Sequence, residues 1–338
     1  MENKLVSIST DAISNIEILH QATKGIHHLH EKRIIHRDLK PQNILLVRLN
    51  ALEIRVKIAD FGISRAIPDE RTSVTLTTTG MAAIGWRSPE ILNFESGTPT
   101  AIKRLSTATD IFSLGCIFYY ILTNGMHPFG QNPVDQEFNI KNYCNISTDH
   151  LPPLLIGNKW LIDNMIVRDP KARPNVKTII SHYIFWKSDK TLEFMAHISD
   201  VLFDYKQDEK IIQLGNDIES YYDVVAPNCH PRFGNPDGWL QMTCPIVRQY
   251  LCENRERTYH GRTLYQLIRT IRNLKGHHGS LAAKWLQVQY TLGSLPCGFV
   301  NYWMSRFPFL LPTLWHLCQS LLQASNDAYD VKRFYTCE

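Results

Sequence analysis

The segment HRDLKPQN, which begins at His36, carries three polar residues whose types and spacing suit phosphoryl transfer. Asp38, Lys40 and Asn43 can converge on one point from a short loop. There the aspartate can accept a proton from a hydroxyl nucleophile, the lysine can neutralise a phosphoryl oxygen, and the asparagine can hold a magnesium ion. A second carboxylate, Asp60, opens the triplet DFG and can complete the metal site from a neighbouring turn.

These two motifs resemble the catalytic and metal-binding loops of a protein kinase, and later motifs continue the resemblance in order. One of them implies a buried helix whose aspartate, Asp110, steadies the catalytic loop. Two others imply an ion pair between Glu90 and Arg173, whose burial would make removal of either charge cost roughly 3–5 kcal/mol. The motifs are WRSPE at 86–90, TDIFSLG at 109–115 and RDPKARP at 168–174.

The kinase resemblance also implies ligands and roles. Asp38 would be the catalytic base and Lys40 a phosphate contact, with Asn43 and Asp60 as ligands of Mg²⁺ and with ATP or ADP in the cleft. A complete kinase has a small lobe with a glycine-rich loop, but the first 35 residues contain one glycine, Gly25, and no strand-like alternation. The sequence as written therefore lacks this lobe. We expect a fragment or a kinase-shaped scaffold, and not a stand-alone serine/threonine kinase.

Apolar residues at helical intervals predict an amphipathic helix over residues 12–30. His27, His28 and His30 lie near its end without a cysteine or carboxylate at ligand spacing. We interpret them as polar residues of the helix end and not as a metal site.

Hydroxyl side chains are dense between the DFG and WRSPE motifs. They fit either a flexible polar loop or an activation segment that is phosphorylated by another molecule, with the new charge bound by an arginine such as Arg37. The residues are Ser64, Thr72, Ser73, Thr75, Thr77, Thr78 and Thr79.

Composition limits the class of protein. The 338 residues suffice for two domains, and 44% hydrophobic with 20% charged residues is typical of a folded globular protein. The eight cysteines form no C-x-x-C pair, which favours reduced thiols over a disulfide framework or a zinc site.

The N-terminus does not read as a signal peptide, and the longest apolar runs are too short to cross a bilayer. As written, the chain is expected to be soluble and cytoplasmic, without membrane contact.

After Trp186 the pattern becomes continuously helical, without a Gly/Ser linker. We therefore expect a mainly α protein: a kinase large lobe over 1–186, helical with few short strands, and an all-helical extension over 187–338. Residues 223–240, rich in Pro, Gly, Asn and Asp, are expected to form a loop.

Positive charge is concentrated between residues 248 and 278, as a phosphate-rich polymer would require. Its cations are Arg248, Arg255, Arg257, Arg262, Arg269, Arg272 and Lys275, against Glu253 and Glu256. A helix is expected here, with one apolar stripe (Leu264, Leu267, Ile268, Ile271) and one polar stripe (Tyr265, Arg269, Arg272, Asn273).

Tyr, Arg, Asn and His in this window are the groups needed to cleave RNA without a metal. One group removes the proton of the ribose 2′-hydroxyl, another protonates the leaving 5′-oxygen, and a cation and an amide stabilise the phosphorane. Histidine, with an unperturbed pKa near ~6.5, suits the acid, whereas tyrosine, near ~10, needs close arginines to act as base. The alternative is a basic solvated helix with a His-rich end.

The order of motifs resembles one family, the inositol-requiring kinase–endoribonucleases of the unfolded protein response, whose nuclease extension is shared with ribonuclease L. Ribonuclease L is the poorer match, because its kinase-like part departs from HRD and DFG. The motifs in the extension are RTY-x-G at 257–261, IRN at 271–273, HH at 277–278, LGSLP at 292–296 and SRFP at 305–308.

This resemblance implies that Tyr259, Arg272, Asn273 and His277 are the nuclease residues, with His278 a nearby rival for the acid. Gly276 stands where relatives usually have a bulkier polar residue, so the loop conformation there is open. The resemblance further implies nucleotide as an ordering ligand, back-to-back pairing of kinase parts, and a composite site for stem-loop RNA. Full-length members span the endoplasmic reticulum membrane once, with these domains in the cytosol. As written, the sequence is expected to be a fragment without the luminal domain and the span.

We therefore expect an RNA endonuclease on a kinase scaffold, regulated by nucleotide, autophosphorylation and dimerisation, which cleaves by 2′-hydroxyl transesterification without a metal. The alternative is a non-catalytic dimerisation module that regulates full-length partners.

Overall fold

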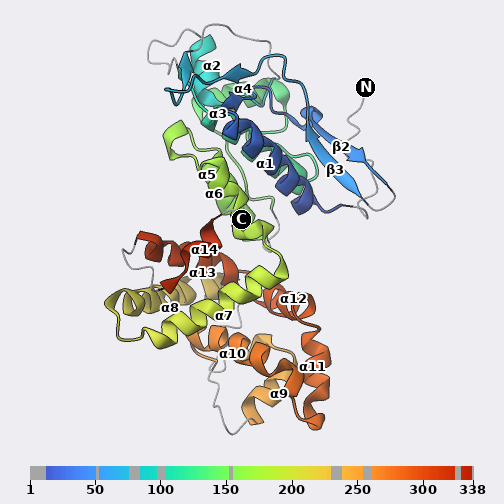
Figure 1. Ribbon diagram of the computed structural model, residues 1–338, viewed down its shortest axis with the longest axis vertical. Coiled ribbons are helices and arrows are strands. Elements are labelled where there is room, and N and C mark those ends of the chain that lie inside the picture. The colour runs from blue at the N-terminus through green and yellow to red at the C-terminus, as the bar shows by residue number, and fades with distance from the viewer. Residues whose placement is uncertain are drawn as a thin grey trace. The chain divides into compact units, whose positions relative to one another are not determined.

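The computed structural model describes residues 13–50, 53–75, 84–96, 104–151, 155–229, 238–253, 261–323 and 329–336. The chain divides into two compact units, with the boundary between Phe185 and Trp186 (Figure 1). Helices predominate in both, and the few strands are short, as predicted. Among the described residues, no helix has the length and apolar character needed to cross a bilayer.

The first unit is built around one deeply buried helix. Helix α3 (Ala108–Leu122) is apolar on nearly all sides, as a helix in the middle of a core must be. The other helices of this unit are α1 (Asn15–Glu31), α2 (Pro89–Glu95), α4 (Pro133–Asn142), α5 (Ile156–Met165) and α6 (Val176–Ile180).

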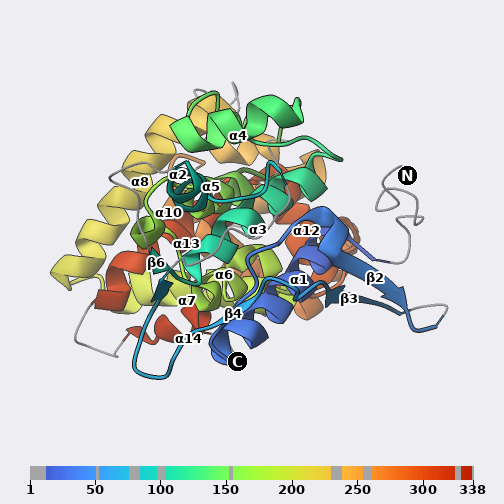
Figure 2. The same ribbon diagram turned by 90° about the horizontal axis from the view of Figure 1, so that it is seen from above.

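Helix α1 confirms the amphipathic helix predicted near the N-terminus. It begins after Ser14, whose side chain accepts a hydrogen bond from the backbone N–H of Glu17 and so caps the first turn. Within the apolar stripe Leu19 and Ile26 are fully buried, whereas Ile16 near the helix start is partly exposed. The β2–β3 hairpin lies beside α1 in both views (Figures 1 and 2), where Gln21 accepts a hydrogen bond from the N–H of Val56 at 2.8 Å.

The strands form antiparallel pairs. These are β1 (Ile34–Ile35) with β4 (Arg65–Ala66), β2 (Ile44–Arg48) with β3 (Ile54–Ile58), and β5 (Val74–Thr75) with β6 (Arg104–Leu105). In the second pair Ile44 is opposite Ile58. This register places Asn43, just before β2, beside Ala59, whose N–H donates to the Asn43 carbonyl at 3.0 Å. The hairpin thus holds the ends of the HRDLKPQN and DFG segments together.

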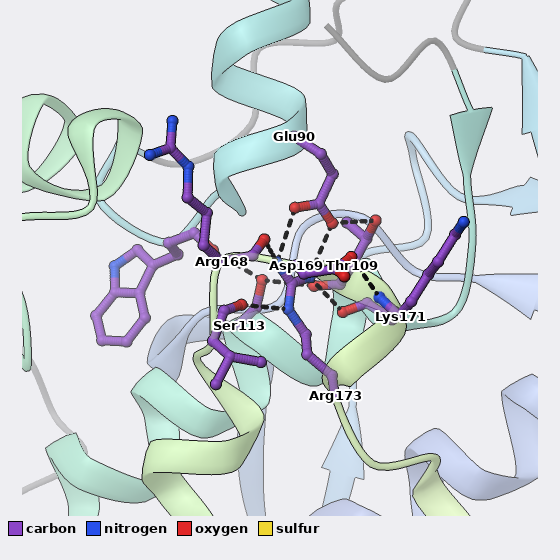
Figure 3. Close-up of polar contacts among 10 residues, drawn as sticks. Glu90, Thr109, Ser113, Arg168, Asp169, Lys171 and Arg173 are labelled. Atoms are coloured by element: carbon purple, nitrogen blue, oxygen red, sulfur yellow. Dashed lines mark hydrogen bonds and ion pairs between the residues drawn. The ribbon is translucent and has the colours of Figure 1, made fainter.

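The predicted ion pair between Glu90 and Arg173 is confirmed, as Figure 3 shows. Two guanidinium nitrogens of Arg173 donate to the two carboxylate oxygens at 2.8 and 2.9 Å, and the side chains are 0% and 3% exposed. Arg173 also donates to the carbonyl oxygens of Val167, Ala108 and Arg168. Because these bonds use the remaining donors, the buried cation is fully compensated.

The second unit is helical, and no strand occurs among its described residues. Its helices are α7 (Ser188–Asp204), α8 (Glu209–Cys229), α9 (Pro245–Glu253), α10 (Leu264–His277), α11 (Leu286–Leu292), α12 (Cys297–Arg306), α13 (Leu310–Cys318) and α14 (Lys332–Tyr335). Helix α10 packs along α7 (Figure 1). Its apolar stripe, Leu264, Leu267, Ile268 and Ile271, is fully buried, as predicted.

The bounds of one loop differ from the sequence-based expectation. The prediction of a loop over 223–240 was wrong at both ends, because α8 continues to Cys229 and a 3₁₀ helix spans Gly238–Met242. Residues 223–226 read DVVA and include neither glycine nor proline, so nothing in them stops a helix that is already formed. Residues 230–237 lie outside the described part of the chain.

Candidate active site

The catalytic-loop residues of the first unit converge on one carboxylate. Lys40 Nζ donates to Asp38 Oδ2 at 2.6 Å, and the Asn43 amide nitrogen donates to the same oxygen at 3.2 Å and to the Asp38 carbonyl at 2.7 Å. Asp38 and Asn43 are buried, whereas Lys40 is partly exposed. These hydrogen bonds from Lys40 and Asn43 hold the Asp38 carboxylate in a defined orientation.

Asp110 of α3 anchors the backbone of this loop. Its two carboxylate oxygens accept hydrogen bonds from the backbone N–H groups of His36 and Arg37, both at 2.9 Å. The loop needs such an anchor because Arg37 has φ of 72°, a conformation that L-residues rarely adopt. The structure confirms the predicted role of Asp110 as the residue that steadies the loop.

His30 also binds Asp110, which the sequence reasoning missed. Its ring nitrogen Nε2 lies 2.8 Å from Asp110 Oδ2, and its side chain is only 6% exposed. His30 does lie in the last turn of α1, as predicted, but its contact with Asp110 was not expected. Its spacing gave no signal, because the partner lies 80 residues further along the chain.

The residues expected to bind Mg²⁺ supply oxygen atoms from adjacent turns. Asp60 follows Ala59, the residue hydrogen-bonded to the Asn43 backbone, and its side chain is exposed. The amide nitrogen of Asn43 donates to Asp38. The Oδ1 atom of Asn43 accepts no hydrogen bond within the described residues, so it can act as a metal ligand. An amide and a carboxylate oxygen suit the preference of Mg²⁺ for hard ligands, so this pair fits the ion.

Two cations lie close together beside the hydroxyl-rich segment. Burial, and then the positive charge of Arg65, lower the pKa of Arg37. Of the hydroxyls in this segment, Thr72 and Thr75 are exposed and Ser73 is buried. Residues 76–83, with Thr77, Thr78 and Thr79, lie outside the described ranges.

The second unit brings two of the predicted nuclease residues into one pocket. Arg272 donates from Nε to Asp200 Oδ1 at 2.8 Å and from Nη1 to Asn273 Oδ1 at 3.3 Å. A cavity of about 150 Å³ opens between α7 and α10 at this point. Its lining consists of Ser199, Asp200, Phe203, Arg269, Arg272 and Asn273.

The histidine pair divides into one exposed and one buried side chain. His277, the last residue of α10, is exposed and follows Asn273 by four residues, which places it one turn along the same side of the helix. His278 is 8% exposed, and its Nε2 lies 2.8 Å from the carbonyl oxygen of Gly293. Only His277 is therefore open to a substrate. Tyr259 lies outside the described residues.

Helix α10 is held at its N-terminus by a carboxylate from α8. The two oxygens of Glu219 accept hydrogen bonds from the backbone N–H groups of Leu264 and Tyr265 at 2.9 and 2.8 Å. Thr263 caps the same end by accepting from the N–H of Gln266. A negative charge at this end also complements the helix dipole. Neither Glu219 nor Asp200 was expected from sequence, because they precede their partners by 45 and 72 residues.

Comparison with known proteins assigns a domain to each unit. The protein kinase domain family matches residues 2–185, and the ribonuclease 2-5A family matches residues 191–332. A kinase domain of this type binds a nucleotide, generally with Mg²⁺. The chain thus combines a protein kinase domain with a ribonuclease domain.

Two of the three curated relatives described next carry both a kinase and an endoribonuclease activity in their names. The chain is 35% identical over 334 residues to "Sensor for unfolded proteins in the ER ire1" of Schizosaccharomyces pombe, covering 92% of this chain and 29% of that protein. It is 34% identical to the serine/threonine-protein kinase/endoribonuclease IRE1 of Hypocrea jecorina (92% and 26%) and 33% identical to the human IRE2 (87% and 30%). The chain belongs to the Ire1 family of kinase/endoribonucleases, and it spans less than a third of the length of these relatives.

Proposed function

We propose that the second unit is an endoribonuclease that cleaves stem-loop RNA by attack of a ribose 2′-hydroxyl on the adjacent phosphate, leaving a cyclic phosphate. The observation that carries the proposal is the placement of Arg272 and Asn273 in one pocket, with the exposed His277 one turn further along α10. The match of this unit to the ribonuclease 2-5A family supports it.

In this mechanism each side chain has one task. Arg272 and Asn273 donate hydrogen bonds to the phosphorane as negative charge develops on its oxygens. The imidazolium of His277 transfers a proton to the departing 5′-oxygen, and Tyr259 removes the proton of the 2′-hydroxyl. All the groups are organic side chains, so the reaction is proposed to need no metal.

The kinase unit is proposed to regulate this cleavage. Asp38, Lys40, Asn43 and Asp60 would hold a nucleotide with Mg²⁺, which neutralises the phosphate charges when bound. Occupation of the cleft would order the unit and favour pairing with a second copy, or with a complete family member, so that two nuclease units share one RNA. Given the names of its relatives, we propose that the protein acts in the unfolded protein response at the cytosolic face of the endoplasmic reticulum.

Arg37 and Arg65 support a further regulatory step, phosphorylation of the segment between residues 64 and 79. The positive charge of Arg65 helps to lower the pKa of Arg37, so an added phosphate that is bound by both cations would relieve this repulsion. Mass spectrometry of protein from its native cell tests this, since absence of phosphate there would contradict it.

The main experiment compares His277→Ala with His278→Ala. The first variant should lose cleavage of a stem-loop RNA while keeping its melting temperature, because His277 is exposed. Wild-type product should carry a 2′,3′-cyclic phosphate by mass spectrometry, and in assays without nucleotide EDTA should not slow its formation. Full activity of His277→Ala with loss in His278→Ala would show that the acid is misassigned. A wild-type chain that cleaves no RNA, and only inhibits a complete family member, would instead be a regulatory module.

A further inference from the structure

The pocket beside Arg272 contains an aromatic side chain that the cleavage chemistry does not use. Phe203, in the last turn of α7, is 46% exposed, although a phenylalanine in a helical unit is normally buried. It lines the same cavity as Arg272 and Asn273. An exposed aromatic ring that lines a pocket offers a face on which a ligand can stack.

Two cations flank this ring. The guanidinium carbon of Arg269 lies 5.0 Å from the ring centroid and Lys206 Nζ lies 5.4 Å from it. Neither cation forms an ion pair with a carboxylate in the described part of the chain. Both distances are within the range of a cation–π contact, in which the cation lies over the face of the ring. A phosphate can draw such a cation off the ring, which opens the face for stacking.

The polar lining adds hydrogen-bonding groups. Ser199 and Asn273 are buried, and Asp200 is bonded to Arg272. The pocket thus has two guanidinium groups against one carboxylate, which gives it a positive balance. Its volume of about 150 Å³ is half of the ~300 Å³ at the lower end of pockets for drug-sized ligands, and so suits one planar ring.

We infer that Phe203, with Arg269 and Lys206 beside it, is a stacking subsite for one RNA base next to the cleaved phosphate. This inference rests on the proposed endoribonuclease function. An aromatic face accepts any base without strict sequence preference, and nearby cations bind the flanking phosphates. Arg272 belongs to both the pocket and the proposed catalytic group, so the stacked base belongs to a nucleotide adjacent to the reacting one.

Binding and cleavage are measured separately. The binding probe is a stem-loop RNA with 2′-O-methyl groups throughout its loop, which prevents attack by the 2′-oxygen, and with 2-aminopurine at each loop position in turn. Phe203→Ala should weaken binding about tenfold and remove the fluorescence quenching of one 2-aminopurine position. Phe203→Trp should retain both the affinity and the quenching. Phe203→Leu should behave like Phe203→Ala, because leucine keeps apolar area but has no aromatic ring. Arg269→Gln should lower the dependence of affinity on salt.

Tyr290→Ala is the matched control, since Tyr290 is 77% exposed on α11 and does not line the pocket. Unchanged affinity and quenching in Phe203→Ala would overturn the subsite. A change in self-association by sedimentation, with RNA affinity unaltered, would instead assign the ring to an interface between copies. If the wild type cleaves no RNA but binds it through Phe203, the proposed nuclease fails and the subsite stands. If it binds no RNA, both fail.

Discussion

Asp200 on α7 binds Arg272 on α10 through a hydrogen bond of 2.8 Å from Nε to Oδ1. Both side chains are about half exposed, at 45% and 48%, so the pair adds at most about 1 kcal/mol to stability. It does, however, fix the direction of a guanidinium group that also donates from Nη1 to Asn273 and lines the pocket. The contact is therefore more important for positioning than for folding.

Asp200→Asn tests that positioning. We expect kcat for RNA cleavage to fall about tenfold, because Arg272 loses its charged partner and samples other rotamers. KM should stay equal or fall, since one negative charge leaves the RNA-binding pocket. The melting temperature should not change. Asp204→Asn, on the same helix and outside the pocket lining, is the control, and equal kinetics for the two variants would exclude a role for the pair.

Glu219→Ala tests the cap of α10. The backbone N–H groups of Leu264 and Tyr265 would lose their acceptor, and the helix end would lose a favourable negative charge. We expect a loss of about 1–2 kcal/mol in the free energy of unfolding by urea denaturation. Glu209→Ala, at the exposed start of α8, should have little effect. A change below the error of the measurement for Glu219→Ala would show that water replaces the cap without cost.

Glu90→Gln tests the buried ion pair of the first unit. The Arg173 cation would remain buried without its counter-charge, and we expect destabilisation by about 3–5 kcal/mol. Removing the exposed pair of Glu53 and Arg55 by Arg55→Gln should cost no more than about 1 kcal/mol. Denaturation curves of both variants measure the contrast. Similar losses would mean that burial does not set the strength of the Glu90 pair.

Acid should destabilise the first unit through two buried histidines. Burial lowers the pKa of His127 to about 4 and that of His182 to about 3. The unfolded chain, with histidine pKa near ~6.5, binds more protons than the folded chain as pH falls from about 6.5 to 4, so stability is lost over this range. At pH 5 each histidine should cost on the order of 2 kcal/mol.

The check is the unfolding free energy of His127→Gln at pH 7 and pH 5. The variant should show a smaller difference between the two pH values than the wild type, whatever its absolute stability. His28→Gln, at an exposed position of α1, should keep the full pH dependence. An identical pH dependence in His127→Gln and wild type would mean that His127 does not titrate on unfolding.

Local patterns in the sequence determined much of the fold. Apolar residues at helical spacing identified α1 and α10, and the structure buries the whole predicted stripe of α10 and most of that of α1. The motifs also identified two long-range relationships, Glu90 with Arg173 and Asp110 with the catalytic loop. Those pairings followed from the resemblance to protein kinases, because spacing alone does not show which distant charges meet. The nuclease roles of Tyr259, Arg272, Asn273 and His277 stay predictions.

Only the tertiary structure decided which partners hold the candidate sites. Asp200, Glu219 and His30 belong to no motif, and each meets its partner through the packing of helices that are far apart in the sequence. The exposure of Phe203 likewise depends on which residues of α7 are covered by α10 and which are left exposed. Helical periodicity specifies which side of a helix is buried, but the neighbouring helix that buries it, and the polar groups that line their junction, follow from packing of the whole unit.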